Sequence, residues 1–246
     1  MGSWFELNQG KNFACNNHQW DSNIPIVSFN EDEFCNDLYG ELQSKGCCSR
    51  YVEISHRALE KRVPKLSNES IILEVGGKLG EHCKYVTHQY QKYIVSDYRQ
   101  IELPYFNEKT VFEQQNVETL SYDDNTFDRV LMGCLLHHVD FPETALRQKR
   151  RVTKNGGVVS ITLPSDPGML YRMAKRLGPY RSLRKLDSQY RPEYFHYLQH
   201  RNHFPGILSQ IYEVFKDDVI REKSFPFPVR AWNINLFTIF QIEIAK

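Results

Sequence analysis

Short apolar runs, separated by stretches of roughly helical length, are the feature that most constrains the fold of this chain of 246 residues. Each run is rich in β-branched residues and is continuous rather than alternating, as expected of a strand buried on both faces. Strands of this kind that alternate with crossover segments are typical of a parallel sheet covered by helices. The runs begin at Ile71 and read, in order, ILEV, YIVSD, VFEQQNV, DRVLMG and GGVVSITLP.

The end of the chain predicts a change in strand direction. Two further strand-like segments, DDVIREKSF and NINLFTIFQIEIA, lie on either side of a turn region that contains Pro226 and Pro228. Such a pair predicts a closing antiparallel hairpin. The Tyr-, Arg- and His-rich segment before it is not required by an α/β core, so we predict an inserted cap. The expected parts are a helical or irregular cover over 1–69, a core over 70–163, a substrate cap over 164–210, and a closing helix and strands over 211–246.

The composition excludes several classes of protein. Hydrophobic residues make up 41% of the chain and charged residues 25%, as in folded globular proteins. The formal net charge of +1 gives no electrostatic reason to expect nucleic acid as a partner. No apolar stretch approaches the ~20 residues of a membrane-spanning helix, and no leader-like pattern opens the chain. Six scattered cysteines without a C-x-x-C pair predict reduced thiols and a cytoplasmic protein.

A glycine-rich segment after the first run carries the strongest functional signal. An acid ends the expected strand, and a turn and then an expected helix follow; the residues are Glu74, Gly76, Gly77, Lys78 and Gly80. Glycines let the backbone adopt positive φ and approach a ligand closely. The second run ends in Asp97, 23 residues after the first acid, where a carboxylate can accept the hydroxyls of a ribose. We therefore predict a nucleoside site.

Two common nucleotide motifs do not fit this segment. The dinucleotide fingerprint G-x-G-x-x-G fails because Lys78 stands at its second glycine, and no G-x-x-x-x-G-K-[ST] occurs. The segment instead resembles motif I of the class I S-adenosylmethionine-dependent methyltransferases. Further motifs of that superfamily follow in order, so the resemblance covers roughly residues 70–163. They are Asp97, the segment Asn116–Leu120 with Asp123–Asp128, the segment Leu135–Val139, and the segment Arg151–Gly157.

The resemblance implies S-adenosylmethionine as cofactor. We accordingly predict an α/β fold with a Rossmann-like, mostly parallel seven-stranded sheet, a C-terminal antiparallel hairpin and an inserted helical cap. By the same resemblance the glycines line the methionine and ribose, Asp97 binds the ribose hydroxyls, and Glu74 supports the loop or the methionyl amine. The remaining cofactor contacts are assigned to Asn116, Val117, Cys134 and Leu135.

Some positions depart from the family pattern or allow a second interpretation. Lys78 stands at a usual glycine, Asn116 at a common Asp and Gln148 at a common Glu. Lys78 either holds the methionyl carboxylate, crowds that end of the site, or is solvated. For Asp97 the alternative role is that of a helix N-cap.

Three histidines of the cap are candidates for catalysis. His196, His200 and His203 stand at i, i+4 and i+7, so they share one face if the segment beyond Pro192 is helical. One interpretation makes His196 or His200 a general base; the others are a metal site and a hydrogen-bonding face that orders the cap. Because no acidic or cysteine partner stands at ligand spacing, we expect no bound metal.

Two other segments supply further candidates. His137 and His138 follow the fourth run, at the edge where ligands bind in open parallel sheets, and either face the pocket or pack the start of a helix. Asp166 follows the fifth run and either acts as a base, orients one, or forms a turn.

An excess of basic residues in the cap predicts the acceptor. Arginine and lysine suit phosphate and carboxylate groups, which favours O-methylation of a small anionic acceptor, such as a nucleotide-linked or surface-polysaccharide sugar or a phosphate-bearing metabolite. A loose likeness of residues 166–197 to methyltransferases of surface-polysaccharide synthesis agrees with this. Interleaved tyrosines keep RNA as a second choice, and a non-catalytic nucleoside-binding module is a third. The basic residues are Arg172, Lys175, Arg176, Arg181, Arg184, Lys185 and Arg191.

Overall fold

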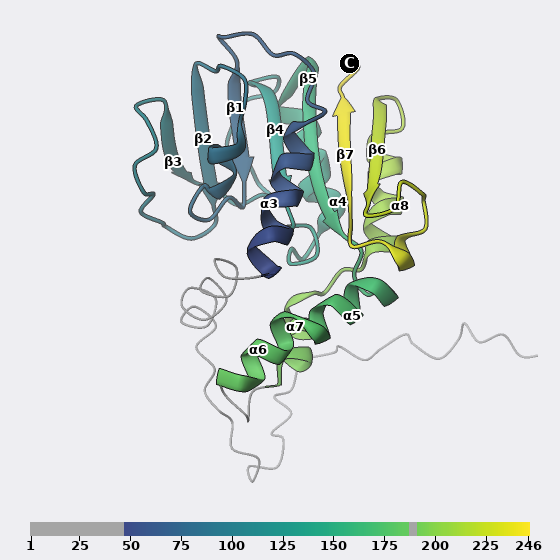
Figure 1. The fold of residues 1–246 in the computed structure, drawn as a ribbon. Coiled ribbons are helices and arrows are strands. Elements are labelled where there is room, and N and C mark those ends of the chain that lie inside the picture. Colours follow the sequence, from purple (N-terminus) through teal and green to yellow (C-terminus); the bar gives the residue numbers. More distant parts are fainter. Residues whose placement is uncertain (1–46, 187–190) are drawn as a thin grey trace, which may run out of the picture. The chain divides into compact units, whose positions relative to one another are not determined.

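The computed structural model describes residues 47–186 and 191–246, all of which belong to one structural unit. Most of the expected N-terminal cover, residues 1–46, lies outside the described residues. The part described is built around one sheet with helices packed against it (Figure 1).

The sheet has seven strands in the order β3-β2-β1-β4-β5-β7-β6. Neighbours from β3 to β5 are parallel, whereas β7 runs antiparallel to both β5 and β6. This confirms the predicted mostly parallel sheet with its C-terminal antiparallel hairpin. From β1 the chain first adds β2 and β3 on one side and then β4 and β5 on the other. The carboxyl ends of β1 and β4 therefore form the edge where ligands bind in such sheets. The strands are β1 (Ile71–Val75), β2 (Lys92–Asp97), β3 (Thr110–Gln114), β4 (Phe127–Gly133), β5 (Thr153–Pro164), β6 (Val219–Phe225) and β7 (Phe237–Glu243).

Strand β1 shows why the central runs are continuously apolar. Leu73 and Val75 belong to a core cluster with buried residues of α4 (Pro142–Val152) and α8 (Phe204–Val214). Ile72 belongs to a second cluster, with Tyr93 of β2. Because successive side chains of a strand point to opposite faces, both faces of β1 are buried.

The crossovers in the first half of the sheet differ from the expected helices. The segment after the glycine turn forms only a short 3-10 helix, η2 (Glu81–Tyr85), and residues 98–109 and 115–126 contain no helix. Aromatic and β-branched residues lower helix propensity in the first segment, and Pro104 lacks the N–H that a helix needs in the second. Buried Cys83 and partly buried Val86 and Phe106 pack on this face instead.

Three short helices follow β5 in the region assigned to the cap. Figure 1 shows α5 (Met169–Leu177), α6 (Pro179–Leu186) and α7 (Pro192–Gln199) beyond the carboxyl end of β5. Helix α8 begins inside the range expected for the cap, yet Ile207 and Ile211 are part of the main core cluster. A 3-10 helix, η3 (Trp232–Ile234), lies between β6 and β7 and contacts α5.

A buried ion pair joins α3 (Cys47–Glu60) to the sheet. Arg129 of β4 is fully buried, and its Nη1 donates to Glu60 Oε1 at 2.6 Å. The Nε2 of His82 lies 2.8 Å from the same carboxylate oxygen. Arg129 Nε also donates to Ser160 Oγ of β5 at 3.0 Å. Burial disfavours the ionised acid, but the hydrogen bonds from His82 and Arg129 lower the pKa of Glu60 to about 2, so the pair is ionised at neutral pH.

Arg129→Met is expected to lower the free energy of unfolding by roughly 3–5 kcal/mol, because it leaves the Glu60 charge buried without its partner. The double variant Glu60→Gln with Arg129→Met should lose less than Arg129→Met alone, since neither charge then remains. Arg57→Ala is the control, because Arg57 pairs with Glu53 on the exposed side of the same helix; its effect should stay within about 1 kcal/mol. Urea denaturation measures all three. An Arg129→Met variant as stable as the control would contradict this role of the pair.

Candidate active site

The turn after β1 has a backbone that accommodates little beyond glycine. Gly76 and Gly80 have φ angles of +66° and +68°. A Cβ added at Gly76 would lie 2.7 Å from Leu135 Cδ2, and one at Gly77 would lie 2.8 Å from the side chain of Glu74. The turn is therefore packed against its own strand and against the segment that follows β4.

Lys78 occupies a left-handed conformation in the same turn, with a φ of 47°. This conformation explains why glycine is usual at this position in the family that the motif resembles. The Lys78 side chain is exposed, and its charge acts on Cys134 and His138 of the segment after β4.

Glu74 supports the turn from inside the sheet. Its side chain is buried, and Oε2 accepts a hydrogen bond from the Tyr93 hydroxyl at 2.8 Å. Burial raises the pKa of Glu74 to about 8, although the Tyr93 hydrogen bond and the charge of Arg129 oppose the shift. Its backbone oxygen also accepts a hydrogen bond from Ser96 Oγ at 3.0 Å, which joins β1 to β2.

Asp97 lies at the carboxyl end of β2 and is buried. Its Oδ1 accepts hydrogen bonds from the backbone N of Arg99 at 3.2 Å and from Arg99 Nε at 3.4 Å. The alternative role of helix N-cap is wrong, because no helix follows β2. The carboxylate instead stabilises a turn at the ligand-binding edge of the sheet.

The other residues assigned to the cofactor lie along the same edge. Asn116 is exposed, and its Oδ1 accepts a hydrogen bond from Glu118 N at 2.9 Å. Val117 is buried in the main core cluster, so its side chain serves packing and only its backbone is available to a ligand. Cys134 and Leu135 are half-buried after β4, and Cys134 has a left-handed φ of 49°.

This set of residues fits a nucleoside cofactor. Because Gly76 and Gly77 carry no Cβ, the turn packs closely against the surrounding side chains and its backbone stays near the edge. Asp97 adds a buried carboxylate at the neighbouring strand end, where ribose hydroxyls are bound in folds of this class.

A second group of residues gathers around Asp166, just beyond β5. Asp166 is buried, and its Oδ2 accepts hydrogen bonds from His196 Nε2 at 3.1 Å and His200 Nδ1 at 2.7 Å. The backbone oxygen of Asp166 accepts from Phe204 N at 2.9 Å, at the start of α8. Asp166 therefore orients two histidines and ties α7 and α8 to the end of β5.

The segment after β4 brings two more histidines to this group. The ring centroids of His137 and His200 lie 4.1 Å apart, and those of His196 and His200 lie 3.8 Å apart. His138 lies beside both, with centroid distances of 4.3 Å to His137 and 4.8 Å to His200. The expected face of three histidines is only partly correct, because α7 ends at Gln199 and exposed His203 stands at the N-cap position of α8, with no capping hydrogen bond from its side chain.

Burial lowers the pKa of His137, His196 and His200 and so favours their neutral form. It lowers the pKa of His200 to about 3, although the hydrogen bond with Asp166 opposes the shift. Burial and the neighbouring histidines hold the pKa of His137 well below its ordinary value. The hydrogen bonds from His196 and His200 outweigh burial at Asp166 and hold its pKa well below the usual range. The group is thus one carboxylate surrounded by neutral rings at pH 7.

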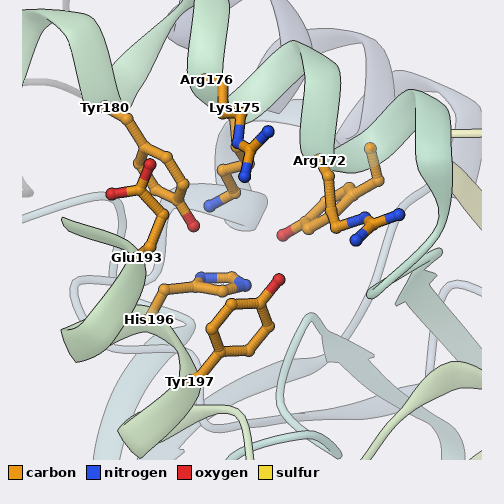
Figure 2. A pocket seen from close by; sticks show the side chains of 8 residues that line it. Arg172, Lys175, Arg176, Tyr180, Glu193, His196 and Tyr197 are labelled. Atoms are coloured by element: carbon orange, nitrogen blue, oxygen red, sulfur yellow. The ribbon is translucent and has the colours of Figure 1, made fainter.

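A pocket opens on His196 between α5, α6 and α7 (Figure 2). Figure 2 shows the Lys175 amine and the Tyr180 hydroxyl directed toward the His196 ring. Basic and aromatic side chains predominate in its wall. The lining residues are Tyr171, Arg172, Lys175, Arg176, Tyr180, Glu193, His196 and Tyr197.

Sequence reasoning identified part of this pocket. Of the seven basic residues expected in the cap, the structure puts Arg172, Lys175 and Arg176 in the pocket wall. Arg184 instead binds both carboxylate oxygens of Glu193, at 2.5 and 2.6 Å, which joins α6 to α7. Sequence reasoning missed Glu193. Its contact with Arg184 joins residues nine positions apart on two different helices, and no local sequence pattern indicates such a contact.

Comparisons with known proteins identify a methyltransferase domain. Residues 73–161 match the model of a methyltransferase domain family. A demethylmenaquinone methyltransferase of Bacillus cereus is 26% identical over 172 residues, which cover 67% of this chain and 72% of that protein. The Bacillus subtilis enzyme of the same name is 32% identical over 127 residues, covering 48% and 54%.

A solved structure supports the same fold. A methyltransferase of Thermotoga maritima, described as S-adenosylmethionine-dependent and as a possible histamine N-methyltransferase, superposes with a TM-score of 0.56 at 16% identity. The superposition covers 86% of this chain and 96% of the Thermotoga maritima protein. Residues 73–161 therefore form a methyltransferase domain. The protein is an S-adenosylmethionine-dependent methyltransferase with the class I fold, and S-adenosylmethionine is its cofactor. Among the described residues, no helix is long and apolar enough to cross a membrane.

The raised pKa of Glu74 predicts a pH-dependent stability. The unfolded chain releases this proton near pH 4.5 and the folded chain only near pH 8, so the folded state binds more protons between these values. The contribution of Glu74 is therefore complete below pH 4.5 and is lost as the pH rises toward 8. Glu74→Gln should remove this decline, and exposed Glu108→Gln, as control, should retain it. Urea denaturation at several pH values measures the slopes; identical slopes in both variants would contradict the prediction.

Asp97→Ala is expected to weaken S-adenosylmethionine binding by about 1–3 kcal/mol, the range for unpaired polar partners. Calorimetric titration measures the affinity. Arg99→Ala is the matched control, because it removes the internal partner of Asp97 and leaves the carboxylate in place. Equal losses in both variants would show that Asp97 serves the turn rather than the ribose.

Proposed function

We propose that the protein methylates an oxygen atom of a small anionic acceptor bound in the cap pocket. The observation that carries the proposal is the charge of the pocket, in which Arg172, Lys175 and Arg176 stand against one acid, Glu193. That acid is itself paired with Arg184 at 2.5 Å. Guanidinium and ammonium groups suit phosphate and carboxylate, so a sugar phosphate, nucleotide sugar or similar metabolite fits this wall.

The electrostatic reach of Lys175 supports a link between the pocket and the cofactor edge. Its charge acts on His196 in the pocket, and also on Cys134 and His137 after β4. An acceptor whose anionic group binds near Lys175 therefore lies within short range of the edge assigned to S-adenosylmethionine.

The chain's own residues supply positioning and a proton acceptor. S-adenosylmethionine, when bound, supplies an electrophilic methyl group. The pocket holds the acceptor so that its hydroxyl oxygen faces that edge. His196 takes the hydroxyl proton as the new carbon–oxygen bond forms and the bond between the methyl group and the cofactor's sulfur breaks, its electron pair staying on sulfur. Asp166 holds His196 through Nε2, which leaves Nδ1 as the base, and it stabilises the ring once charged. His200, on the same carboxylate, fixes the orientation of Asp166.

The direct test is methyl transfer from labelled S-adenosylmethionine to a panel of acceptors. The panel contains nucleotide sugars, sugar phosphates, demethylmenaquinone and total RNA. Label in an anionic sugar supports the proposal. The quinone arm is included because the two Bacillus relatives are named for demethylmenaquinone; label only there, or only in RNA, would overturn the anionic small-molecule assignment.

Variants of the pocket separate acceptor binding from proton transfer. With the anionic acceptor found, Arg176→Gln should raise its KM by about 10- to 150-fold, the equivalent of 1.5–3 kcal/mol for a charged hydrogen bond. Lys185→Gln, exposed on α6 and outside the pocket, should leave KM unchanged. His196→Ala should lower kcat by about 10²- to 10⁴-fold without changing the cofactor affinity. An unchanged kcat would remove the base role from His196.

A further inference from the structure

Three histidines from two distant segments converge between the cofactor edge and the cap pocket. His137 and His138 follow β4, and His200 follows the last residue of α7. One ligand nitrogen from each lies within 4.8 Å of the other two. We propose that His137, His138 and His200 bind a divalent transition-metal ion of the zinc type. This inference rests on the arrangement of the side chains and is independent of the proposed acceptor.

The geometry is close to what such an ion requires. Zinc lies about 2.1 Å from imidazole nitrogen in a tetrahedral site, which puts the ligand nitrogens roughly 3.4 Å apart. The three nitrogens lie within 4.8 Å of one another, so the rings must come closer together to hold the ion. Histidine is the ligand type that suits zinc, cobalt and nickel, whereas magnesium and calcium prefer oxygen ligands.

The partners of the rings match those of metal-binding histidines. Such residues usually donate their second ring N–H to a carboxylate or a backbone carbonyl. His200 Nδ1 is held by Asp166 Oδ2 at 2.7 Å, so its Nε2 is the nitrogen available for coordination. His138 makes a hydrogen bond to the backbone of Gln199. Two of the three ligands are therefore already oriented by a second partner.

Unpartnered buried atoms provide an independent indication of a ligand. Within the described part of the chain, buried His137 Nδ1 has no hydrogen-bond partner. The same is true of Asp166 Oδ1, on the carboxylate that orients His200. Buried polar atoms are rarely left without a partner. A cation beside these groups would occupy the ring nitrogen and would be balanced by the Asp166 charge, which opposes the repulsion from Lys175.

A second set of residues, Asp166, His196 and His200, is also close enough to hold an ion. We favour the three-histidine set because Asp166 Oδ2 is already the acceptor for both His196 and His200. An ion at that oxygen would displace both hydrogen bonds, whereas an ion on the three histidines leaves them in place. His138 is exposed, so the favoured site has room for a fourth ligand from solvent or from the acceptor.

The test measures metal binding by the full chain after treatment with a chelator. Titration with Zn²⁺ should give one equivalent of tight binding, and Co²⁺ should give the visible absorption of a tetrahedral nitrogen site. His138→Ala should weaken Zn²⁺ binding at least about tenfold and abolish the Co²⁺ band. Because His138 is exposed, this variant is expected to fold, and its thermal unfolding is compared with that of the parent chain. His137→Ala and His200→Ala should lose the same signals.

His203→Ala is the control, since His203 is exposed at the start of α8 and outside the set. It should bind Zn²⁺ as the parent does. The proposal is overturned by the absence of stoichiometric binding, by unchanged binding in His138→Ala, or by loss in His196→Ala without loss in His138→Ala. None of these outcomes depends on methyl transfer, so failure of this inference is distinguishable from failure of the proposed function.

Discussion

The buried pair of Glu60 and Arg129 is the interaction on which the sheet and its neighbouring helix depend. Arg129 is fully buried on β4, so its charge is compatible with folding only because α3 delivers a carboxylate to it. The charge of Arg129 also acts on groups beyond this ion pair. It acts on Glu74 at the end of β1, where it limits the rise in pKa that burial causes, and on the hydroxyl of Tyr93. The ion pair that joins α3 to the sheet thus also contributes to the electrostatic environment of the glycine turn.

A similar arrangement holds the opposite part of the site. Asp166 is a buried carboxylate that binds His196 and His200 from the cap and, through its backbone, the first residue of α8. In both places one buried acid links a helix to a strand of the sheet. The difference is that the partners of Asp166 are neutral rings, which are able to accept a proton or a metal ion, whereas Arg129 stays charged and structural.

Parallel topology explains why the glycine turn and the group around Asp166 lie at the same edge of the sheet. The turn after β1, the segment after β4 and Asp166 after β5 all leave the same edge of the sheet, since these strands are parallel neighbours. The helices that follow β5 then supply the basic wall over that edge, with Lys175 acting on groups of both regions. In the function proposed above, the strand ends hold the cofactor and the helices after β5 hold the acceptor.

The sequence by itself determined the strands, their parallel and antiparallel parts, and the cofactor motif. Continuous apolar runs require burial on both faces, and the turn after β1 needs glycine because its φ angles and the contact with Leu135 leave no room for a side chain. Tertiary structure decided the rest. The missing crossover helices, the exclusion of His203 and the pairing of Arg129 with Glu60 follow from packing between segments up to 69 residues apart. Local patterns encode burial and backbone conformation, whereas contacts between distant polar groups exist only once the folded core has fixed their separation.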